Sequence, residues 1–360
     1  MTSGRPPARL KDVAALAGVS VKTVSNVVND YAYVRAETRS RVQQVIADLG
    51  YLPNPAARRL RNGRSGVIAF AVPELDVPYF SELAHHIVHA AVAKGWTVLV
   101  DETGGVPARE RIVASGIRAH LIDGAILSPL SLNVADVADR ISATPMVLLG
   151  ERLGSGPADH VAIDNRSAAQ EATTHLIAAG RRRIAVIGSQ RAPFGHTARL
   201  RLAGYRAALT AAGLRYDPAL VVGSRLWRRS AGMDGARRLL ELDQRPDAVF
   251  CLNDLLALGA MRTFAEFGVG VPDDVAVVGF DDIEESRYST PTLTTMSPDK
   301  RAIAQCAVDR LAMRLEEGVR SPSEEIIVAA TLKVRESSGG SRIPARLAPE
   351  PVSRQDRPSP

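Results

Sequence analysis

The apolar positions near the start of the chain follow the period of two short helices separated by a turn. The stretch LKDVAALAGVSVKTVSNVVN runs from Leu10 to Asn29, with Gly18-Val19-Ser20 as its turn. Ala14 is small enough for two helices to cross closely, and Gly18 can adopt the positive φ of a tight turn. The stretch therefore predicts a helix-turn-helix, a motif that inserts its second helix into the DNA major groove.

The residues around this turn also predict how the helices begin and pack. Ser20 is placed to cap the second helix. The apolar residues expected to face one another across the turn are Val13, Leu16, Val24 and Val27. A further apolar stripe predicts a third helix over 36–49, ended by Gly50. We therefore expect a disordered stretch at 1–9 and a three-helix DNA-binding domain at 10–53.

A short basic segment, 54–65, follows this domain and predicts a hinge helix. Asn54 is placed to cap a helix that Pro55 begins and Gly63 ends. A helix of about eight residues is marginal by itself in water. We therefore expect it to fold fully only on DNA, paired with its copy from a second subunit.

From Gly66 the pattern changes to continuous apolar runs that alternate with helix-length segments. The runs are GVIAFAV, WTVLV, GAIL, MVLL, RIAVIG, DAVFC and VAVVG. Such runs are typical of parallel strands buried on both faces, and two sets of them predict two doubly wound α/β lobes. The predicted fold is thus a helical headpiece followed by a two-lobed α/β core over 66–338, with a disordered tail at 339–360.

The ends of these apolar runs are candidate ligand positions. Open α/β sheets bind ligands outside the carboxyl ends of their strands. The residues that follow the runs are Pro73-Glu74, Asp101, Ser128, Gly150, Asn253-Asp254 and Phe280-Asp281. We therefore expect a ligand site among them.

Composition and charge narrow the class of protein. No apolar run approaches the roughly 18 residues of a membrane span, and no apolar signal segment precedes the helix-turn-helix. Cys251 and Cys306 lie in apolar contexts, which favours reduced thiols, so we expect a cytoplasmic, nucleoid-associated protein. Residues 1–65 hold 11 Lys and Arg against 4 Asp and Glu, a net charge of +7, and the remainder holds 34 against 35. This localised charge favours DNA as a partner over a basic solubilising tail, because it is interleaved with periodic apolar positions.

Signatures of other chemistries do not occur in the sequence. It contains no GxxxxGK[ST], HExxH or GxSxG motif, which gives little support to a nucleotide hydrolase, a metalloprotease or an α/β-hydrolase. We expect neither an enzyme nor a bound cofactor. His85, His86 and His89 place two imidazoles on one helix face, but zinc sites usually have three or four ligands and no Cys or carboxylate pair completes this one. We interpret them as a helix surface or a dimer interface, and expect no metal.

Six segments of the chain follow one another in a recognisable order. They are LKDVAALAGVSVKTVSNVVN, GYLPNPAARRLR, ARLRLAGY, CLNDLLALGAMR, VPDDVAVVGFDD and TPTLTTMSPD. Together they resemble the LacI/GalR family of transcriptional regulators over about residues 10–338. The resemblance implies an operator-binding headpiece and a core similar to periplasmic sugar-binding proteins, with a ligand between the lobes. It also implies one lobe of about 66–162 and 293–320, and another of about 163–291 and 321–338.

The resemblance assigns base reading to the exposed face of the second helix. Val21, Lys22 and Asn26 match the positions through which the family contacts base edges. Lys22 can donate to guanine and Asn26 can pair with adenine, whereas Val21 can contact a thymine methyl group. A solvated helix face is the alternative. The expected phosphate contacts are Ser20, Thr23, Ser25, Asn29 and Tyr31.

The resemblance also covers the hinge segment. Leu60 matches the family leucine that wedges between base steps in the minor groove, and Ala57 and Arg61 are expected beside it. The alternative for Leu60 is a hydrophobic contact with the core. The third helix begins after Arg35, where the family more often has a capping serine. That end is therefore expected to fray or to contact phosphate.

An effector site in the core is the further implication. Arg201 matches the family arginine that contacts hydroxyl or carboxylate groups, and Asn253 and Asp281 match effector-contacting positions after strands. Trp227 is placed to stack on a pyranose face, with an ordinary packed aromatic as the alternative. The full expected set is Phe80, Ser128, Arg201, Trp227, Asn253 and Asp281.

The identity of the effector stays open at this point. The amide and the carboxylate suit sugar hydroxyls, so a sugar is favoured. Gly150 and Pro73 stand where some sugar-responsive members have polar contacts, and a purine- or nucleoside-responsive regulator is the alternative. A ligand-binding module without regulatory DNA binding is disfavoured by the localised charge.

The expected assembly follows from the symmetry of such regulators. We expect a homodimeric repressor on a near-palindromic operator, because a two-fold protein suits a two-fold site, and no membrane partner. The Pro-rich tail has no leucine heptad, which argues against a tetramer.

Overall fold

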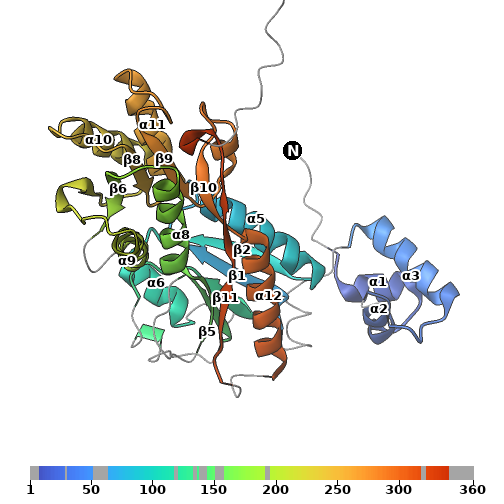
Figure 1. The fold of residues 1–360 in the computed structure, drawn as a ribbon. Helices are drawn as coiled ribbons and strands as arrows, with labels where there is room; N and C mark the ends of the chain where they lie inside the picture. Colours follow the sequence, from blue (N-terminus) through green and yellow to red (C-terminus); the bar gives the residue numbers. More distant parts are fainter. Residues whose placement is uncertain are drawn as a thin grey trace, which may run out of the picture. The chain divides into compact units, whose positions relative to one another are not determined.

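The computed structural model describes residues 8–28, 31–51, 64–116, 121–132, 136–137, 144–150, 158–190, 195–317 and 322–339. Its contacts divide the chain into two units, Met1–Ser65 and Gly66–Pro360 (Figure 1). Within the described ranges, no helix is both long enough and apolar enough to span a membrane.

The first unit contains three helices around a small apolar core. They are α1 (Leu10–Ala17), α2 (Val21–Val28) and α3 (Ala36–Leu49). Gly18 and Gly50 end α1 and α3 with φ of 62° and 57°, the left-handed conformation that glycine adopts without strain. The buried core residues are Val13, Ala14, Ala17, Val24, Val27, Val42 and Tyr51. The predicted helix-turn-helix and third helix are thereby confirmed.

Two details of this unit differ from the expectation. Leu16 is 65% exposed instead of facing α2, because the small Ala17 next to it is the buried residue at that end of α1. The expected disorder of 1–9 does not reach its last two residues. Ala8 packs against the core of the unit, and the backbone N–H of Arg9 donates to Asp12 at 2.8 Å, which caps α1.

The first lobe of the second unit is built on a six-stranded parallel sheet in the order β11-β5-β4-β3-β1-β2. Its strands are β1 (Val67–Val72), β2 (Thr97–Glu102), β3 (Gly124–Leu127), β4 (Met146–Leu149), β5 (Asp159–Ile163) and β11 (Glu325–Val328). Helices α5 (Pro78–Ala93) and α12 (Lys300–Glu317) lie side by side on one face (Figure 1). Helix α6 (Pro107–Ala114) covers the other face.

The apolar runs of this sheet are explained by cover on both faces, with one exception. Phe70 of β1 packs with α5 and α12, whereas its neighbours Ala69 and Ala71 lie on the face that α6 covers. Strand β2 is instead the edge strand, and its Leu99 and Val100 are 43% and 38% exposed. The expectation that WTVLV is buried on both faces is therefore wrong.

The second lobe is built on a sheet in the order β12-β10-β9-β8-β6-β7, in which β12 is antiparallel to β10. Its strands are β6 (Ile184–Ser189), β7 (Val221–Gly223), β8 (Ala248–Cys251), β9 (Ala276–Phe280), β10 (Thr294–Pro298) and β12 (Ala330–Lys333). Its helices form two pairs, α8 (Asn165–Ala178) with α9 (His196–Ala211), and α10 (Arg229–Leu240) with α11 (Asp254–Glu266). The predicted two-lobed α/β core is confirmed.

The chain crosses between the lobes three times, and two crossings differ from the expected positions. Strand β10 pairs with β9, so residues 294–298 belong to the second lobe and not to the first. Strand β11 pairs with β5, so residues 325–328 belong to the first lobe and not to the second. Both strands are short, and their sheet is decided by pairing with distant segments that the local apolar pattern does not reveal. The crossings therefore follow β5, β10 and β11.

Candidate functional site

The outer face of α2 carries the expected base-reading side chains. The hydroxyl of Ser20 accepts a hydrogen bond from the backbone N–H of Thr23 at 3.1 Å, so Ser20 caps the helix as expected. Val21 is 48% exposed and Lys22 is also exposed, whereas Asn26 is half-buried. Lys22 and Asn26 are four residues apart, so they share the side of α2 that faces away from the headpiece core. This face is open to a macromolecular partner.

The loop before α3 supplies other candidate DNA contacts. Tyr31 is 53% exposed and its ring lies 5.5 Å from that of Tyr33, centroid to centroid. Arg35 makes no capping hydrogen bond at the start of α3, but Arg39 donates to the Tyr31 carbonyl at 2.7 Å and joins the helix to the loop. The expected contacts Asn29, Ala57, Leu60 and Arg61 lie outside the described residues.

In the second lobe, Arg201 of α9 is buried against the sheet and is only 5% exposed. Its Nε donates to Asn165 Oδ1 at 2.7 Å, and its Nη1 donates to the carbonyl of Leu252. Its guanidinium carbon lies 3.4 Å from the ring centroid of Phe280 and 5.4 Å from that of Trp227. The guanidinium plane is thus fixed by hydrogen bonds and by aromatic faces.

The Asp281 carboxylate faces this guanidinium at the carboxyl end of β9. Arg201 Nη2 and Asp281 Oδ1 are 3.8 Å apart, which is too long for a hydrogen bond. Asp281 is 8% exposed, and its carboxylate accepts no hydrogen bond from the part of the chain that the structure describes. Burial raises the pKa of Asp281, and the charges of Arg201 and Lys300 oppose this rise. Arg201 and Asp281 are therefore brought together as expected.

Trp227 and Asn253 are also brought to this site, but their polar atoms are engaged within the protein. Trp227 Nε1 donates to the Gly188 carbonyl at 2.8 Å. Asn253 Oδ1 accepts from the Leu256 N–H at 2.9 Å and caps α11, and its Nδ2 lies 3.4 Å from the Trp227 carbonyl. In this structure Asn253 acts as a helix cap that also holds Trp227 in place.

Asp254, the first residue of α11, holds the loop that follows β9. It is fully buried, and its carboxylate accepts hydrogen bonds from Ile283 N–H at 3.0 Å, Ser286 Oγ at 2.8 Å and Thr295 Oγ1 at 2.6 Å. Burial raises the pKa of Asp254, and the nearby Asp281 carboxylate raises it further. Asp254 thus ties the start of α11 to the loop that carries Asp281.

The first lobe contributes Phe80 and Ser128 to this region. Phe80 of α5 packs against a small apolar cluster of Val77, Leu255 and Ile283, the last two from the second lobe. Ser128 follows β3 and is buried, and its backbone N–H donates to the Ala71 carbonyl at 2.9 Å. Phe80 therefore lies at the contact between the lobes.

Arg228, next to Trp227, links the two lobes by charge. Its guanidinium donates to Asp76 at 2.7 and 3.0 Å and lies 2.9 Å from Glu74 Oε2, both in the loop that follows β1. The hydrogen bond from Arg228 lowers the pKa of Asp76. This bidentate contact joins the two loops, but the Asp76 side chain is 73% exposed, so solvent screens the attraction.

Sequence reasoning missed several residues of this region. Asn165 follows β5 just as other candidates follow strands, but the strand DHVAI begins with polar residues and its apolar run is short. Arg228 pairs with residues far away in the sequence, which no local pattern indicates. Asp101 was expected after a strand, but β2 continues to Glu102, so Asp101 lies inside it.

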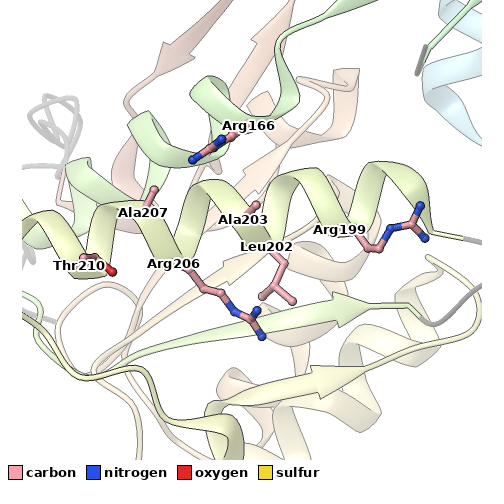
Figure 2. Close-up of a pocket in the computed structure, with 7 residues that line it drawn as sticks. All are labelled: Arg166, Arg199, Leu202, Ala203, Arg206, Ala207 and Thr210. Atoms are coloured by element: carbon pink, nitrogen blue, oxygen red, sulfur yellow. The ribbon is translucent and has the colours of Figure 1, made fainter. Parts of the chain in front are cut away.

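A shallow groove of about 460 Å³ lies along α9 (Figure 2). By its spacing along the helix, Arg201 lies on the opposite face of α9 from this groove. Its lining residues are Arg166, Arg199, Leu202, Ala203, Arg206, Ala207 and Thr210. Arg199 lies 3.0 Å from His196 Nδ1, and Arg206 donates to the Tyr216 hydroxyl at 2.7 Å. The groove is open and its three arginines are exposed, so it does not form part of the Arg201 site.

Comparison with known proteins agrees with a helical headpiece followed by a two-lobed core. Residues 9–54 match the family of bacterial regulatory proteins known as the lacI family, and residues 173–338 match the periplasmic binding protein-like domain. The HTH-type transcriptional repressor PurR of Vibrio campbellii is 32% identical over 91% of this chain and 99% of its own. The chain belongs to the LacI family. LacI-family members are DNA-binding transcriptional regulators and not enzymes, which confirms the class predicted from the sequence.

Other similar proteins extend the likeness across the core. The HTH-type transcriptional repressor CytR of Escherichia coli is 33% identical over 84% of this chain and 88% of its own. A LacI-family regulator from Sanguibacter keddieii is 44% identical over 77% of this chain and all of its own, with a TM-score of 0.72. The lac repressor dimer bound to operator and the anti-inducer ONPF is 30% identical over 92% of this chain and 99% of its own, with a TM-score of 0.80. The regulator CelR in complex with cellobiose is 31% identical over 92% of this chain and all of its own, with a TM-score of 0.68.

Proposed function

We propose that this LacI-family regulator is a homodimeric repressor whose operator affinity is controlled by a small polyhydroxylated molecule bound beside Arg201 and Asp281. The observation that carries the proposal is the Asp281 carboxylate, which is 8% exposed and accepts no hydrogen bond within the described ranges. The Asp281 side chain is still 11% exposed, so a ligand can reach its oxygens and donate a hydrogen bond to them.

The geometry of the site favours a hydroxyl as the donor. A carboxylate only accepts hydrogen bonds, whereas a hydroxyl both donates and accepts. One hydroxyl can therefore donate to Asp281 and accept from Arg201 across their 3.8 Å separation. The Trp227 ring, held through Nε1, offers an apolar face for a sugar ring. The cellobiose complex of CelR supports a sugar, and the ring N–H of a purine is the other donor that would fit Asp281.

The DNA side of the proposal rests on the exposed face of α2. Val21, Lys22 and Asn26 would contact base edges in the major groove of a near-palindromic operator, one copy in each half-site. The operator-bound dimer of the lac repressor supports this assembly. For the hinge, the sequence prediction stands that Leu60, with Ala57 and Arg61, enters the minor groove. Leu60→Ala should weaken operator binding far more than nonspecific DNA binding, and equal losses would count against a wedge.

A thermal-shift screen of the full-length protein tests the effector class. The probes are cellobiose, ribose, hypoxanthine, guanine and cytidine, with wild type and Asp281→Asn measured in parallel. Binding to the native state raises the melting temperature. A sugar should raise it in wild type and not in Asp281→Asn. A purine that does so instead would replace the sugar, and a ligand that stabilises both proteins equally would place the effector away from Asp281.

A further inference from the structure

The loop that follows β9 is held by a lysine that belongs to the other lobe. Lys300 is the first residue of α12, directly after the crossing from β10. Its Nζ donates to the carbonyls of Asp281 at 2.7 Å and Asp282 at 2.9 Å. It also forms an ion pair with Glu82 Oε2 of α5 at 2.7 Å. A lysine ammonium has three N–H groups, and all three find partners here.

The backbone of this loop is shaped for that contact. Asp281 and Asp282 have φ of 118° and 48°, a conformation that residues other than glycine rarely adopt. Successive carbonyls of an extended chain point to opposite sides, so they could not both reach one ammonium. The strained conformation directs the two carbonyls to Lys300, and this contact offsets part of its cost.

Glu82 completes a connection from the loop to the first lobe. Its Oε2 pairs with Lys300, and its Oε1 accepts from the backbone N–H of Glu284 at 3.0 Å. Both oxygens of one α5 side chain are thus engaged with the loop, one directly and one through Lys300. The Lys300 and Glu82 side chains are 11% and 28% exposed, so solvent screens their attraction less than that of a surface pair.

The remainder of the loop is anchored within the second lobe. The Asp282 carboxylate accepts from Arg335 Nη2 at 2.6 Å and from Ser297 Oγ at 2.9 Å. Asp254 holds the loop at Ile283 and Ser286. A displacement of the Asp281 peptide therefore passes to Lys300, because the neighbouring residues are fixed.

We propose that Lys300 and Glu82 are positioning residues that transmit the state of the Asp281 carboxylate to helix α5. Asp281 presents its carboxylate to Arg201 and its carbonyl to Lys300, so a change at one end of the residue alters the other. Lys300 then shifts against Glu82, and α5 responds. This step rests on the proposed function in taking Asp281 as the effector contact.

Methyl NMR of the full-length protein tests this relay without any ligand. Asp281→Asn is the perturbation. The reporters are the methyl groups of Leu83, which is next to Glu82, and of Ile87, which lies about one and a half turns further along α5; both are buried in the first lobe. The perturbation is introduced into wild type, Lys300→Met, Glu82→Gln and, as a matched control, Arg301→Met. Arg301 is the exposed cation next to Lys300.

Asp281→Asn should displace the reporter resonances in wild type and in Arg301→Met. In Lys300→Met and Glu82→Gln the displacement should fall below about a fifth of the wild-type value, as in a double-mutant cycle of coupled sites. If Lys300→Met does not fold, Glu82→Gln carries the test, since its amide oxygen can still accept from Glu284. If the reporter resonances shift as much in Lys300→Met or Glu82→Gln as in wild type, the relay is overturned. It is also overturned if Asp281→Asn does not shift them in wild type. A failed ligand screen would count against the proposed function alone, because this measurement uses no ligand.

Discussion

Val21 and Lys22 on α2 are exposed, whereas Arg201, Asn253 and Asp281 in the second lobe are each less than a tenth exposed. The headpiece side chains therefore contribute little to folding and remain available for DNA. The second-lobe side chains are part of the packed structure, and Arg201 alone contacts Asn165, Leu252 and Phe280. In the proposed function, the exposed α2 side chains contact DNA, and the buried second-lobe side chains contact the effector. Substitutions should therefore separate binding from stability on α2 and couple the two at Arg201.

The largest loss of unfolding free energy is expected from Arg201→Met. The change removes the hydrogen bonds to Asn165 and Leu252 and the guanidinium charge that lies beside Asp281. Losing one partner of a buried pair typically costs about 3–5 kcal/mol of unfolding free energy. Urea unfolding at neutral pH measures it. Arg199→Met, on the exposed side of the same helix, is the control and should stay within about 0.5 kcal/mol of wild type. Equal free energies of unfolding for the two variants would show that Arg201 does not stabilise the fold.

Asp159→Asn should have the next largest effect and sharpens the comparison with Asp281. Asp159 is fully buried, whereas Asp281 is 8% exposed. The Asp159 carboxylate accepts from Arg314 at 2.7 Å, Arg310 at 3.0 Å and Glu324 N–H at 2.8 Å. Burial raises the pKa of Asp159, yet the hydrogen bonds from Arg314 and Arg310 more than offset this and bring it to about 2. A lowered folded-state pKa stabilises the protein above the ordinary Asp value and loses that stability as the pH falls from about 4 toward 2.

Asp159→Asn should therefore lower the free energy of unfolding by about 2.5 kcal/mol at pH 7, with the difference shrinking below about pH 4. Denaturant unfolding over this pH range measures the effect. A difference that stays constant with pH would show that the Asp159 charge is not its origin.

Lys22→Ala should affect DNA binding without affecting the fold. A lost base contact typically costs about 1–3 kcal/mol of binding free energy, and an exposed substitution changes stability by less than about 0.5 kcal/mol. Fluorescence anisotropy on an operator selected from random sequence measures the first quantity, and thermal unfolding the second. Lys11→Ala, an exposed cation on α1, is the matched control and should retain base discrimination. A Lys22→Ala protein with unchanged base preference would exclude α2 Lys22 from sequence reading.

The smallest effect on stability is expected from Asp281→Asn. Burial raises the pKa of Asp281 in the folded state, so its ionisation destabilises the fold as the pH rises from the ordinary Asp value through the raised one. Asp281→Asn removes this penalty and should be at least as stable as wild type at pH 7, in contrast to Asp159→Asn. Thermal unfolding between pH 4 and 7 checks the sign, and a clear loss of stability at pH 7 would mean that Asp281 is a structural carboxylate.

The fold was predictable where local pattern decides it. The turn at Gly18 and the apolar run of β1 follow from residue types and spacing alone. The sheets of β10 and β11 were not predictable, because each is assigned by pairing with a distant strand. At the site, the family resemblance predicted Arg201 and Asp281 as neighbours. The hydrogen bond between Glu82 and Glu284 was not predictable, because these residues are 202 positions apart and no local pattern indicates their contact.

In the proposed function, effector binding at the Asp281 carboxylate controls how tightly the exposed face of α2 binds the operator. The most direct test measures the operator dissociation constant with and without the ligand that the thermal-shift screen identifies, in wild type and in Asp281→Asn. Wild type should change its operator affinity by about 5–150-fold on ligand binding, the range of typical allosteric coupling, and Asp281→Asn should not respond. A ligand that binds wild type but leaves its operator affinity unchanged, or an Asp281→Asn protein that responds like wild type, would contradict the account.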